Sequence, residues 1–227
     1  LRLMFLIRAE GVTKTYRKGA TEIPVLRGVD LEIAPGEMIA ITGSSGVGKS
    51  TLLHALGTLE RPDAGKILYG PTNQNILQFS EKGLSQFRNR VLGFVFQFHY
   101  LLPEFDALEN VMMPALIAGD DRDTSAKHAR ELLEFVGLGH RLHHRPSELS
   151  GGEQQRVAVA RSVILRPKLL LADELTGNLD SQNSQNVMDL LASLNQATGI
   201  SILIVTHDAA IAGRMHRVLK MQDGRFV

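Results

Sequence analysis

The chain has 227 residues, 44% of them hydrophobic and 22% charged, which is typical of a globular protein rather than a disordered or collagen-like one. Its 25 basic and 24 acidic residues give a formal charge of +1, so the sequence carries no basic footprint for binding nucleic acid. It contains no cysteine, which excludes disulfides and thiolate metal sites and is compatible with a reducing cytosol. From the length we expect one folded unit with an inserted lobe.

The first third of the chain predicts strands followed by a helix. Residues 1–7 (LRLMFLI) lack a small-residue cleavage site and lead directly into strand-like sequence, which indicates a strand rather than a signal peptide. Residues 25–33 and 37–43 predict two more strands, joined by a proline-glycine turn. After a glycine-rich stretch, residues 61–66 break a helical pattern of leucines, which are Leu52, Leu53, Leu56 and Leu59.

The sequence from about residue 84 to residue 149 changes to a helical texture. Residues 106–116 and 123–137 predict helices, which we interpret as a lobe inserted into the core. Residues 169–174 (LLLADE) and 200–207 (ISILIVTH) are nearly all apolar, as in strands buried on both faces of a parallel sheet, and a crossover helix is predicted between them. The apolar runs are only a few residues long, far short of the about 20 that span a bilayer.

The glycine-rich stretch GSSGVGKST fits the pattern G-x-x-x-x-G-K-[ST] between a predicted strand and a predicted helix. Glycines allow backbone N–H groups to surround phosphates, Lys49 adds a positive charge, and the Ser50 hydroxyl can bind Mg²⁺. The strand-to-helix context disfavours the alternative of a glycine turn without a ligand. We predict a nucleotide-binding loop formed by Gly43, Ser44, Ser45, Gly46, Val47, Gly48, Lys49, Ser50 and Thr51.

Two adjacent carboxylates, Asp173 and Glu174, end the predicted buried strand at 169–174. Neighbouring side chains in an extended chain point to opposite sides, so one can complete the shell of Mg²⁺ while the other faces a water molecule. A solvated strand end is the alternative, and the nearby phosphate loop argues against it. A second glycine loop, LSGGEQQR at residues 149–156, begins another predicted helix and is also suited to hold an anion.

Five motifs in this order resemble the ATP-binding subunits of ABC transporters, namely residues 43–51, LSGGEQQR, LLLADE, GNLD at 177–180 and VTHD at 205–208. The resemblance covers essentially the whole chain. It implies an α/β fold with a P-loop NTPase core and a mainly parallel sheet, an N-terminal antiparallel β region and an inserted helical lobe. The single domain of residues 1–227 would comprise a core of 1–83 and 150–227 and a lobe of about 84–149.

The resemblance also implies ATP and Mg²⁺ as cofactors and assigns catalytic roles to three residues. Glu174 matches the base that activates water, and Gln97 matches the glutamine that senses Mg²⁺ and that water. His207 matches the histidine that contacts the γ-phosphate. For binding, Tyr16 matches the aromatic residue that stacks on adenine, and Asp173 matches a metal ligand. Taken alone, Gln97 and Tyr16 would more often be structural residues.

The second glycine loop is explained by the family's homodimer, in which two chains meet head to tail. Ser150, Gly151 and Gly152 of one chain would cover the γ-phosphate held by the other chain, and Asp180 would link the two sites. One residue departs from the family, because Leu175 stands where proline usually follows the base. This frees the backbone beside the base and puts a normal rate of turnover in question.

Within the family, residues 94–116 and 144–161 are most similar to the ATPases of bacterial lipoprotein-releasing complexes. ATPases of macrolide-efflux and cell-division complexes are alternatives. The resemblance implies two integral membrane subunits, contacted through the helical lobe and the Gln97 region, and a peripheral position on the cytoplasmic face of the inner membrane. No nucleic-acid partner is expected.

The sequence disfavours two other classes of protein and one other kind of site. ABC ATPases of DNA repair share the motifs but carry a long coiled-coil insertion, whereas this chain has only a short helical lobe without sustained heptads. A small-molecule kinase leaves LSGGEQQR, Gln97 and His207 unexplained. His140, His143 and His144 have metal-ligand spacing, but flanking arginines would repel a cation, so we expect a solvated surface segment.

Overall fold

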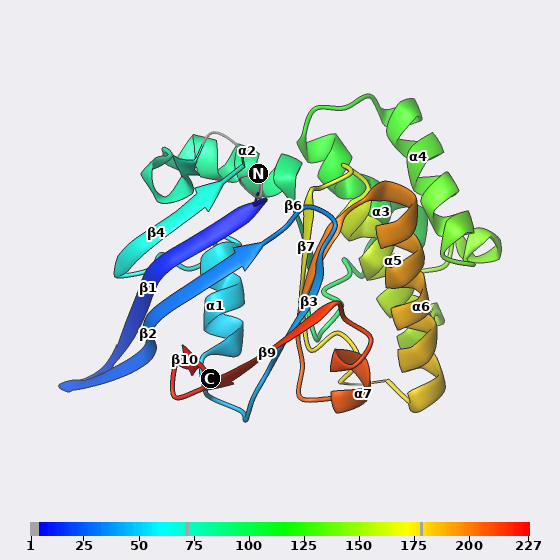
Figure 1. The fold of residues 1–227 in the computed structure, drawn as a ribbon. Coiled ribbons are helices and arrows are strands. Elements are labelled where there is room, and N and C mark those ends of the chain that lie inside the picture. The colour runs from blue at the N-terminus through cyan, green and yellow to red at the C-terminus, as the bar shows by residue number, and fades with distance from the viewer. Residues whose placement is uncertain (1–4, 71–72, 178) are drawn as a thin grey trace.

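The computed structural model describes residues 5–70, 73–177 and 179–227 (Figure 1). The strands are β1 (Ile7–Lys18), β2 (Thr21–Ile33), β3 (Met38–Thr42), β4 (Ala64–Tyr69), β5 (Gln74–Asn75), β6 (Leu92–Val95), β7 (Leu169–Asp173), β8 (Ser201–Val205), β9 (Arg217–Gln222) and β10 (Arg225–Phe226). The helices are α1 (Lys49–Leu56), α2 (Glu81–Val91), α3 (Ala107–Ile117), α4 (Arg122–Phe135), α5 (Gly151–Val163), α6 (Ser181–Thr198) and α7 (Ala209–Ala212), with short 3₁₀ turns at Ile76–Gln78, Gly139–Arg141 and Pro146–Glu148. Within these described ranges, no helix is both long enough and apolar enough to cross a membrane.

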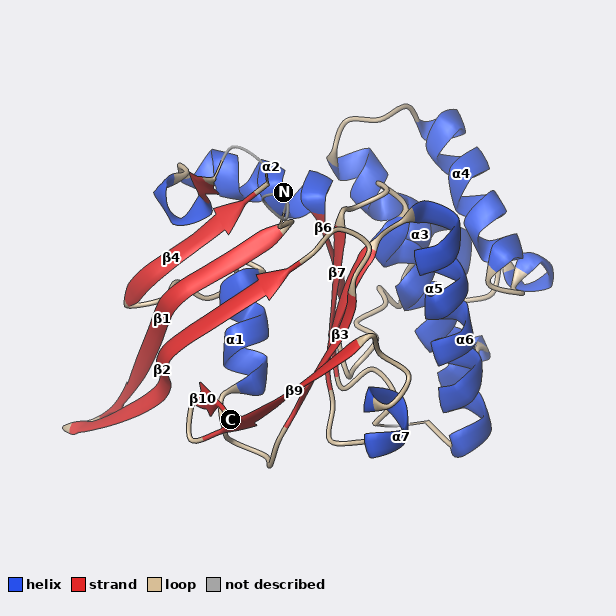
Figure 2. Ribbon diagram, viewed as in Figure 1, coloured by secondary structure: helices blue, strands red, loops and turns tan. Residues whose placement is uncertain are grey.

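The strands form two sheets (Figure 2). The antiparallel sheet has the order β2-β1-β4-β5, and the six-stranded sheet has the order β10-β9-β3-β8-β7-β6. Five strands of the larger sheet, β9 to β6 in that order, run parallel. The predicted fold class is therefore confirmed, with an antiparallel β region beside a mainly parallel core.

The parallel sheet is covered on both faces, which explains its apolar strand sequences. Alternate residues such as Ala40, Leu170 and Ile202 belong to a core shared with α3, α4, α5 and α6. The residues between them, such as Ile39 and Leu203, belong to a second core shared with α1 and the antiparallel sheet. The two layers are visible on either side of the parallel strands in Figure 1. Helices α1 and α5 therefore lie on opposite faces of one sheet.

The predicted elements agree with the structure at most points and differ at one helix end. The strands predicted at 25–33 and 37–43 are confirmed as β2 and β3, and the crossover helix is α6. The predicted first helix is too long, because α1 ends at Leu56 and Leu59 is 47% exposed. Gly57 ends it beside the ring of Phe94, so close that a Cβ at this glycine would lie 2.3 Å from a ring carbon.

Two expectations at the borders of the core also need correction. Most of the strand predicted at 1–7 lies outside the described residues, since β1 begins at Ile7. Strand β6 falls inside the range expected for the helical lobe, yet it pairs with β7 in the parallel sheet. Helix α2 also lies with the core, where Phe87 meets the Tyr69 ring edge-to-face at a centroid distance of 4.9 Å. The helices that form a separate lobe thus begin after β6.

A buried asparagine ties the first lobe helix to the loop that follows β6. The Asn110 side chain accepts a hydrogen bond from the Leu102 N–H at 2.8 Å. Its amide nitrogen lies 3.0 Å from the carbonyl oxygens of Leu102, Phe105 and Asp106. Because the side chain is almost fully buried, these bonds replace water at the start of α3.

We expect Asn110→Ala to lower the free energy of unfolding by about 2 kcal/mol, because the loop loses its bonded partner inside the protein. Urea denaturation followed by circular dichroism measures the change. Asn186→Ala is the matched control, since Asn186 is exposed and its side-chain oxygen accepts a hydrogen bond from the exposed Gln182. An equal loss in both variants would contradict the structural role of Asn110.

Candidate active site

The glycine loop between β3 and α1 has a backbone that only glycine fits well. Gly43, Gly46 and Gly48 have φ angles of 151°, 79° and 104°. A Cβ at Gly43 would lie 2.4 Å from the Met221 carbonyl oxygen, and one at Gly48 would lie 2.8 Å from the Val25 carbonyl oxygen. Both conformation and space therefore require glycine at two of these positions. The result is a narrow loop whose backbone can approach a ligand closely.

The start of α1 is arranged to receive an anion. Gly48 caps the helix without a side-chain hydrogen bond, and the first turn has no acidic residue, so the terminal N–H groups stay open to a ligand. Lys49 is only 5% exposed, and its Nζ donates to the carbonyl oxygens of Gly43 and Ser44 at 2.9 Å each. These two bonds hold an ammonium group, which has three donors, inside the loop.

Asp173 and Ser50 meet beside this loop. The Ser50 hydroxyl donates to Asp173 Oδ1 at 3.1 Å, which joins the end of β7 to the first turn of α1. Burial raises the pKa of Asp173, while the Ser50 hydrogen bond, His54 and Lys49 partly oppose the rise. A hydroxyl and a carboxylate are oxygen ligands that suit Mg²⁺. Burial makes the charged form of the carboxylate unfavourable, and a bound cation would offset this free energy of desolvation.

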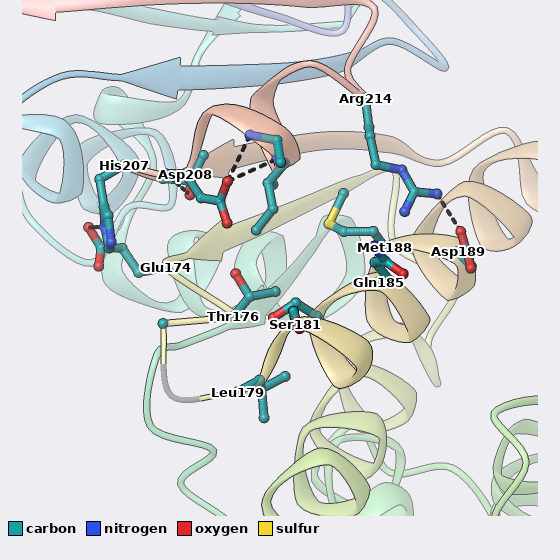
Figure 3. Close-up of a pocket in the computed structure, with 15 residues that line it drawn as sticks. Glu174, Thr176, Leu179, Ser181, Gln185, Met188, Asp189, His207, Asp208 and Arg214 are labelled. Atoms are coloured by element: carbon teal, nitrogen blue, oxygen red, sulfur yellow. Dashed lines mark hydrogen bonds and ion pairs between the residues drawn. The ribbon is translucent and has the colours of Figure 1, made fainter.

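Glu174, His207 and Gln97 gather around the turn that follows β7. His207 Nδ1 lies 3.2 Å from Glu174 Oε1. Figure 3 shows these two side chains next to each other. Gln97 also lies close to this turn. A Cβ built on Gly177 would lie 3.3 Å from Gln97 Nε2 and 3.7 Å from Glu174 Oε2, so both side chains are near the same glycine. The three side chains that we predict to be catalytic thus come from three segments and converge on one turn.

The backbone of this turn is unusual and well anchored. Glu174 has a φ of 45°, in the left-handed region that few non-glycine residues adopt. Its N–H donates to the Val205 carbonyl oxygen and its own carbonyl accepts from Gly177, both at 2.9 Å. Leu175, where the family usually has proline, is buried in the core shared with the lobe helices. Apolar packing therefore fixes the chain immediately after the proposed base.

A cavity of about 540 Å³ opens beside the Glu174–His207 pair, between α6 and α7 (Figure 3). Leu179, Met188 and Ile211 are among its apolar lining residues. An ion pair between Arg214 and Asp189 also lines it. The proposed base therefore borders a hollow rather than a filled core.

The second glycine loop caps α5 through a reciprocal pair of side chains. The Ser150 hydroxyl accepts from the Glu153 N–H at 3.3 Å, and the Glu153 carboxylate accepts from both the Ser150 N–H and its hydroxyl at 2.8 Å. These bonds lower the pKa of Glu153. A Cβ at Gly152 would lie 2.5 Å from Asn183 Oδ1, so the loop is packed tightly on the first turn of α6.

Asp180 belongs to this second group. It caps α6, accepting from the Asn183 N–H at 2.8 Å, and this bond lowers the pKa of Asp180. Asn183 therefore joins Asp180 to the Ser150–Gly152 loop. The phosphate loop precedes α1, which packs on the opposite face of the parallel sheet. Within one chain the predicted binding residues thus form two separate groups.

Tyr16 lies on the β1–β2 hairpin, where it pairs with Ile23 and is 38% exposed. The same hairpin approaches the phosphate loop at Gly48, through Val25. Tyr16 therefore lies on the element that borders the loop, and the Lys14 ammonium lies over its ring, 5.4 Å from the ring centre.

A hydrogen-bonded network behind Gln97 is not evident from the sequence. Gln154 of the second glycine loop lies 3.1 Å from His99 Nδ1 through its side-chain oxygen. Arg161 of the same helix donates to the carbonyl oxygens of His99 and Tyr100 at 2.7 Å. Burial lowers the pKa of both His99 and Arg161. Helix α5 therefore fixes the segment directly after Gln97.

Among the described residues, no three His, Cys, Asp or Glu side chains are grouped closely enough to hold a metal ion, and this includes the histidines at 140–144. Their surroundings are more specific than a solvated segment. His143 Nδ1 lies 3.0 Å from Asp106 Oδ2 at the start of α3, although the ring is largely exposed. His144 Nε2 lies 2.9 Å from Arg141 Nη1. His143 therefore links this segment to the start of α3.

A phosphate loop with a buried lysine, followed by two carboxylates at the carboxyl edge of a parallel sheet, defines a P-loop ATPase core. The sequence matches the family model described as "ABC transporter" over residues 26–177. The chain belongs to the ABC transporter family, as one of its ATPase subunits.

Relatives extend this match over nearly the whole chain. It is 53% identical to the "Lipoprotein-releasing system ATP-binding protein LolD" of Geobacter metallireducens, in an alignment that covers 98% of each chain. It is 50% identical to the protein of the same name from Syntrophus aciditrophicus, covering 98% of this chain and 99% of that one. Among solved structures, it is similar to the dimeric ATP-binding cassette MJ0796 bound to ADP and Pi, with a TM-score of 0.89, 36% identity and coverage of 97% and 96%.

We expect Asp173→Asn to stabilise the nucleotide-free protein and to abolish Mg²⁺-dependent hydrolysis. The folded state holds the Asp173 proton more tightly than the unfolded state, so the carboxylate costs stability as the pH rises above the ordinary aspartate range. The gain in melting temperature should therefore be larger at pH 8 than at pH 4.5, as measured by thermal denaturation at both pH values. A gain that does not depend on pH would contradict this assignment.

Proposed function

We propose that the chain is the ATP-hydrolysing subunit of a bacterial lipoprotein-releasing complex, acting as an ATP-closed homodimer on two membrane subunits. The main observation in favour of the dimer is where the two glycine loops of one chain lie. They precede helices α1 and α5, which cover opposite faces of one sheet. A second chain, rather than the first, would bring them together on one nucleotide. The dimeric state of MJ0796 and the names of the LolD relatives support the assembly and the cargo.

The phosphates of ATP would bind in the loop of residues 43–51, where the open N–H groups of α1 and the Lys49 ammonium would contact them. Ser50, Asp173 and Gln97 would hold Mg²⁺, and the buried carboxylate with its hydroxyl partner fits such a cation. When bound, the cation neutralises charge that develops on the phosphates. Tyr16 would stack on adenine from the neighbouring hairpin.

Glu174 would act as general base by accepting a proton from the attacking water. Its left-handed backbone and buried neighbour Leu175 fix its position, and His207 beside it would contact the γ-phosphate. Ser150, Gly151 and Gly152 of the second chain would close over that phosphate, with Asp180 at the same interface. Each chain would therefore contribute half of each of two sites.

The membrane subunits would dock on a groove beside the Gln97 segment. The groove, about 420 Å³ in volume, is lined by apolar side chains that include Leu59, Phe94, Phe96 and Ile117. Ile117 is 74% exposed, and the nearby Phe98 and Tyr100 are exposed as well. Arg161, which holds the segment after Gln97, also lines the groove. A partner bound here would thus act directly on the segment that carries Gln97, from a peripheral position on the inner membrane.

We expect two inactive variants to restore hydrolysis when mixed. Ser150→Arg blocks the approach of the second chain, and Lys49→Ala removes the charge that faces the phosphates, so each homodimer lacks a complete site. A mixed dimer regains one site, and ATPase activity should rise at least about tenfold above either variant alone.

The control for this mixture is ATP binding by dilute, monomeric Ser150→Arg. Its affinity should stay within about twofold of the unmodified chain, because the phosphate loop lies in the same chain. Loss of ATP binding in this monomer would show that the second loop belongs to the chain's own pocket. A mixture that shows no more ATPase activity than either variant alone would contradict the shared site.

We expect Ile117→Glu to reduce recovery of the chain with its membrane subunits by roughly tenfold, because a charge would be placed in the apolar groove. The isolated protein should keep its ATPase activity. Phe135→Glu is the matched control, since Phe135 is an exposed apolar residue on α4 and the same charge is introduced. Co-purification from detergent-solubilised membranes measures the effect, and equal recovery of the two variants would overturn the docking site.

A further inference from the structure

A partly exposed ion pair joins the segment at 139–145 to the second glycine loop. Arg141 Nε lies 3.3 Å from Glu153 Oε1, and the side chains of Arg141 and Glu153 are 36% and 16% exposed. The Nε atom itself is shielded from solvent and makes no hydrogen bond to a described residue, so its contact with Glu153 is electrostatic. The other carboxylate oxygen of Glu153 accepts both bonds from Ser150. Glu153 therefore has one oxygen on the loop and the other on Arg141.

The carboxylate of Glu153 creates an electrostatic conflict for a loop that receives a phosphate. A first-turn glutamate stabilises a helix that is alone, because it satisfies the positive end of the helix. The same negative charge repels an incoming anion at the same end. The lowered pKa of Glu153 means that this charge persists at neutral pH. Without compensation, the cap that orders the loop would therefore weaken its function.

We propose that Arg141 is a positioning residue that neutralises Glu153, so that the capped loop can close on the partner chain's nucleotide. This inference rests on the proposed function, since it concerns the loop's role in a shared site. Arg141 touches no nucleotide in this scheme and acts only through Glu153 and Ser150.

The placement of Arg141 supports this role. Its Nη1 lies 2.9 Å from His144 Nε2, so the guanidinium is held on two sides. The backbone N–H of His144 donates to the Arg141 carbonyl oxygen, and its own carbonyl accepts from Ala107 at the start of α3. The Arg141 guanidinium is therefore held in place by His144, whose backbone is bonded to the start of the lobe. Arg156 also lowers the pKa of Glu153, but it makes no ion pair with that carboxylate among the described residues.

The test is a double-mutant cycle on ATP-driven dimer formation in chains that carry Glu174→Gln, which keeps ATP uncleaved. We expect Arg141→Ala to raise the ATP concentration at half-maximal dimerisation by about tenfold, measured by light scattering. In a Glu153→Gln background the same change should shift it less than about twofold, because glutamine keeps the cap without the charge. Arg141→Lys, which keeps the charge, should stay within about threefold of the parent.

Two controls separate charge compensation from a folding defect. Arg145→Ala removes one positive charge from an exposed residue of the same segment and should leave the midpoint unchanged. Monomeric ATP binding should be unchanged in the Arg141 variants, because the phosphate loop is distant in the fold. A midpoint shift in Arg141→Ala that persists fully in the Glu153→Gln background would overturn the inference.

The mixed dimers add a test of which chain Arg141 serves. Arg141→Ala placed in the Lys49→Ala chain, which supplies the intact second loop, should lower the restored hydrolysis by about tenfold. Placed in the Ser150→Arg chain, it should have no effect, whereas a general folding defect would lower both. If the parent Glu174→Gln chain formed no dimer with ATP, the shared site would fail, and this inference with it. If the dimer formed normally and Arg141→Ala had no effect, only the role of Arg141 would be refuted.

Discussion

Burial of the parallel sheet on both of its faces is the constraint on which the rest of the structure depends. Its central strands contribute only apolar side chains to the two cores, so every polar group of the site must lie at the ends of the strands. The phosphate loop follows β3, the two carboxylates lie at the end of β7 and directly after it, and His207 follows β8. Three segments far apart in the sequence therefore meet at one edge of the parallel sheet.

In the proposed function, the same sheet separates the part of the site that one chain provides from the part that its partner provides. Helix α1, on one face, follows the predicted phosphate loop, and helix α5, on the other face, follows the loop that we propose to act on the partner's nucleotide. Helix caps complete this second loop, since Ser150, Glu153, Asp180 and Asn183 satisfy the ends of α5 and α6. The loop is ordered before any partner arrives, so association would not have to pay for its folding.

Much of this could be predicted from the sequence, because the relevant signals are local. Apolar runs define the buried strands, glycine spacing defines the phosphate loop, and the order of the motifs identifies the family. The sequence could not show that α1 ends at Leu56, because the ring of Phe94 from another strand fixes that turn. It also could not assign β6 to the core, since a four-residue strand is recognised only by its pairing with β7. The links from Gln154 to His99 and from Arg141 to Glu153 join residues whose spacing carries no periodic signal.

The buried carboxylate of Asp173 has a consequence for the life of the protein in a cell. Burial raises the pKa of Asp173, whose carboxylate accepts a hydrogen bond from Ser50. In the proposed function, bound nucleotide and cation would compensate for this desolvation and add the free energy of binding. Empty chains would then open more often and be cut more readily by proteases. Nucleotide supply would in this way set not only how fast the subunit works but how many copies of it survive.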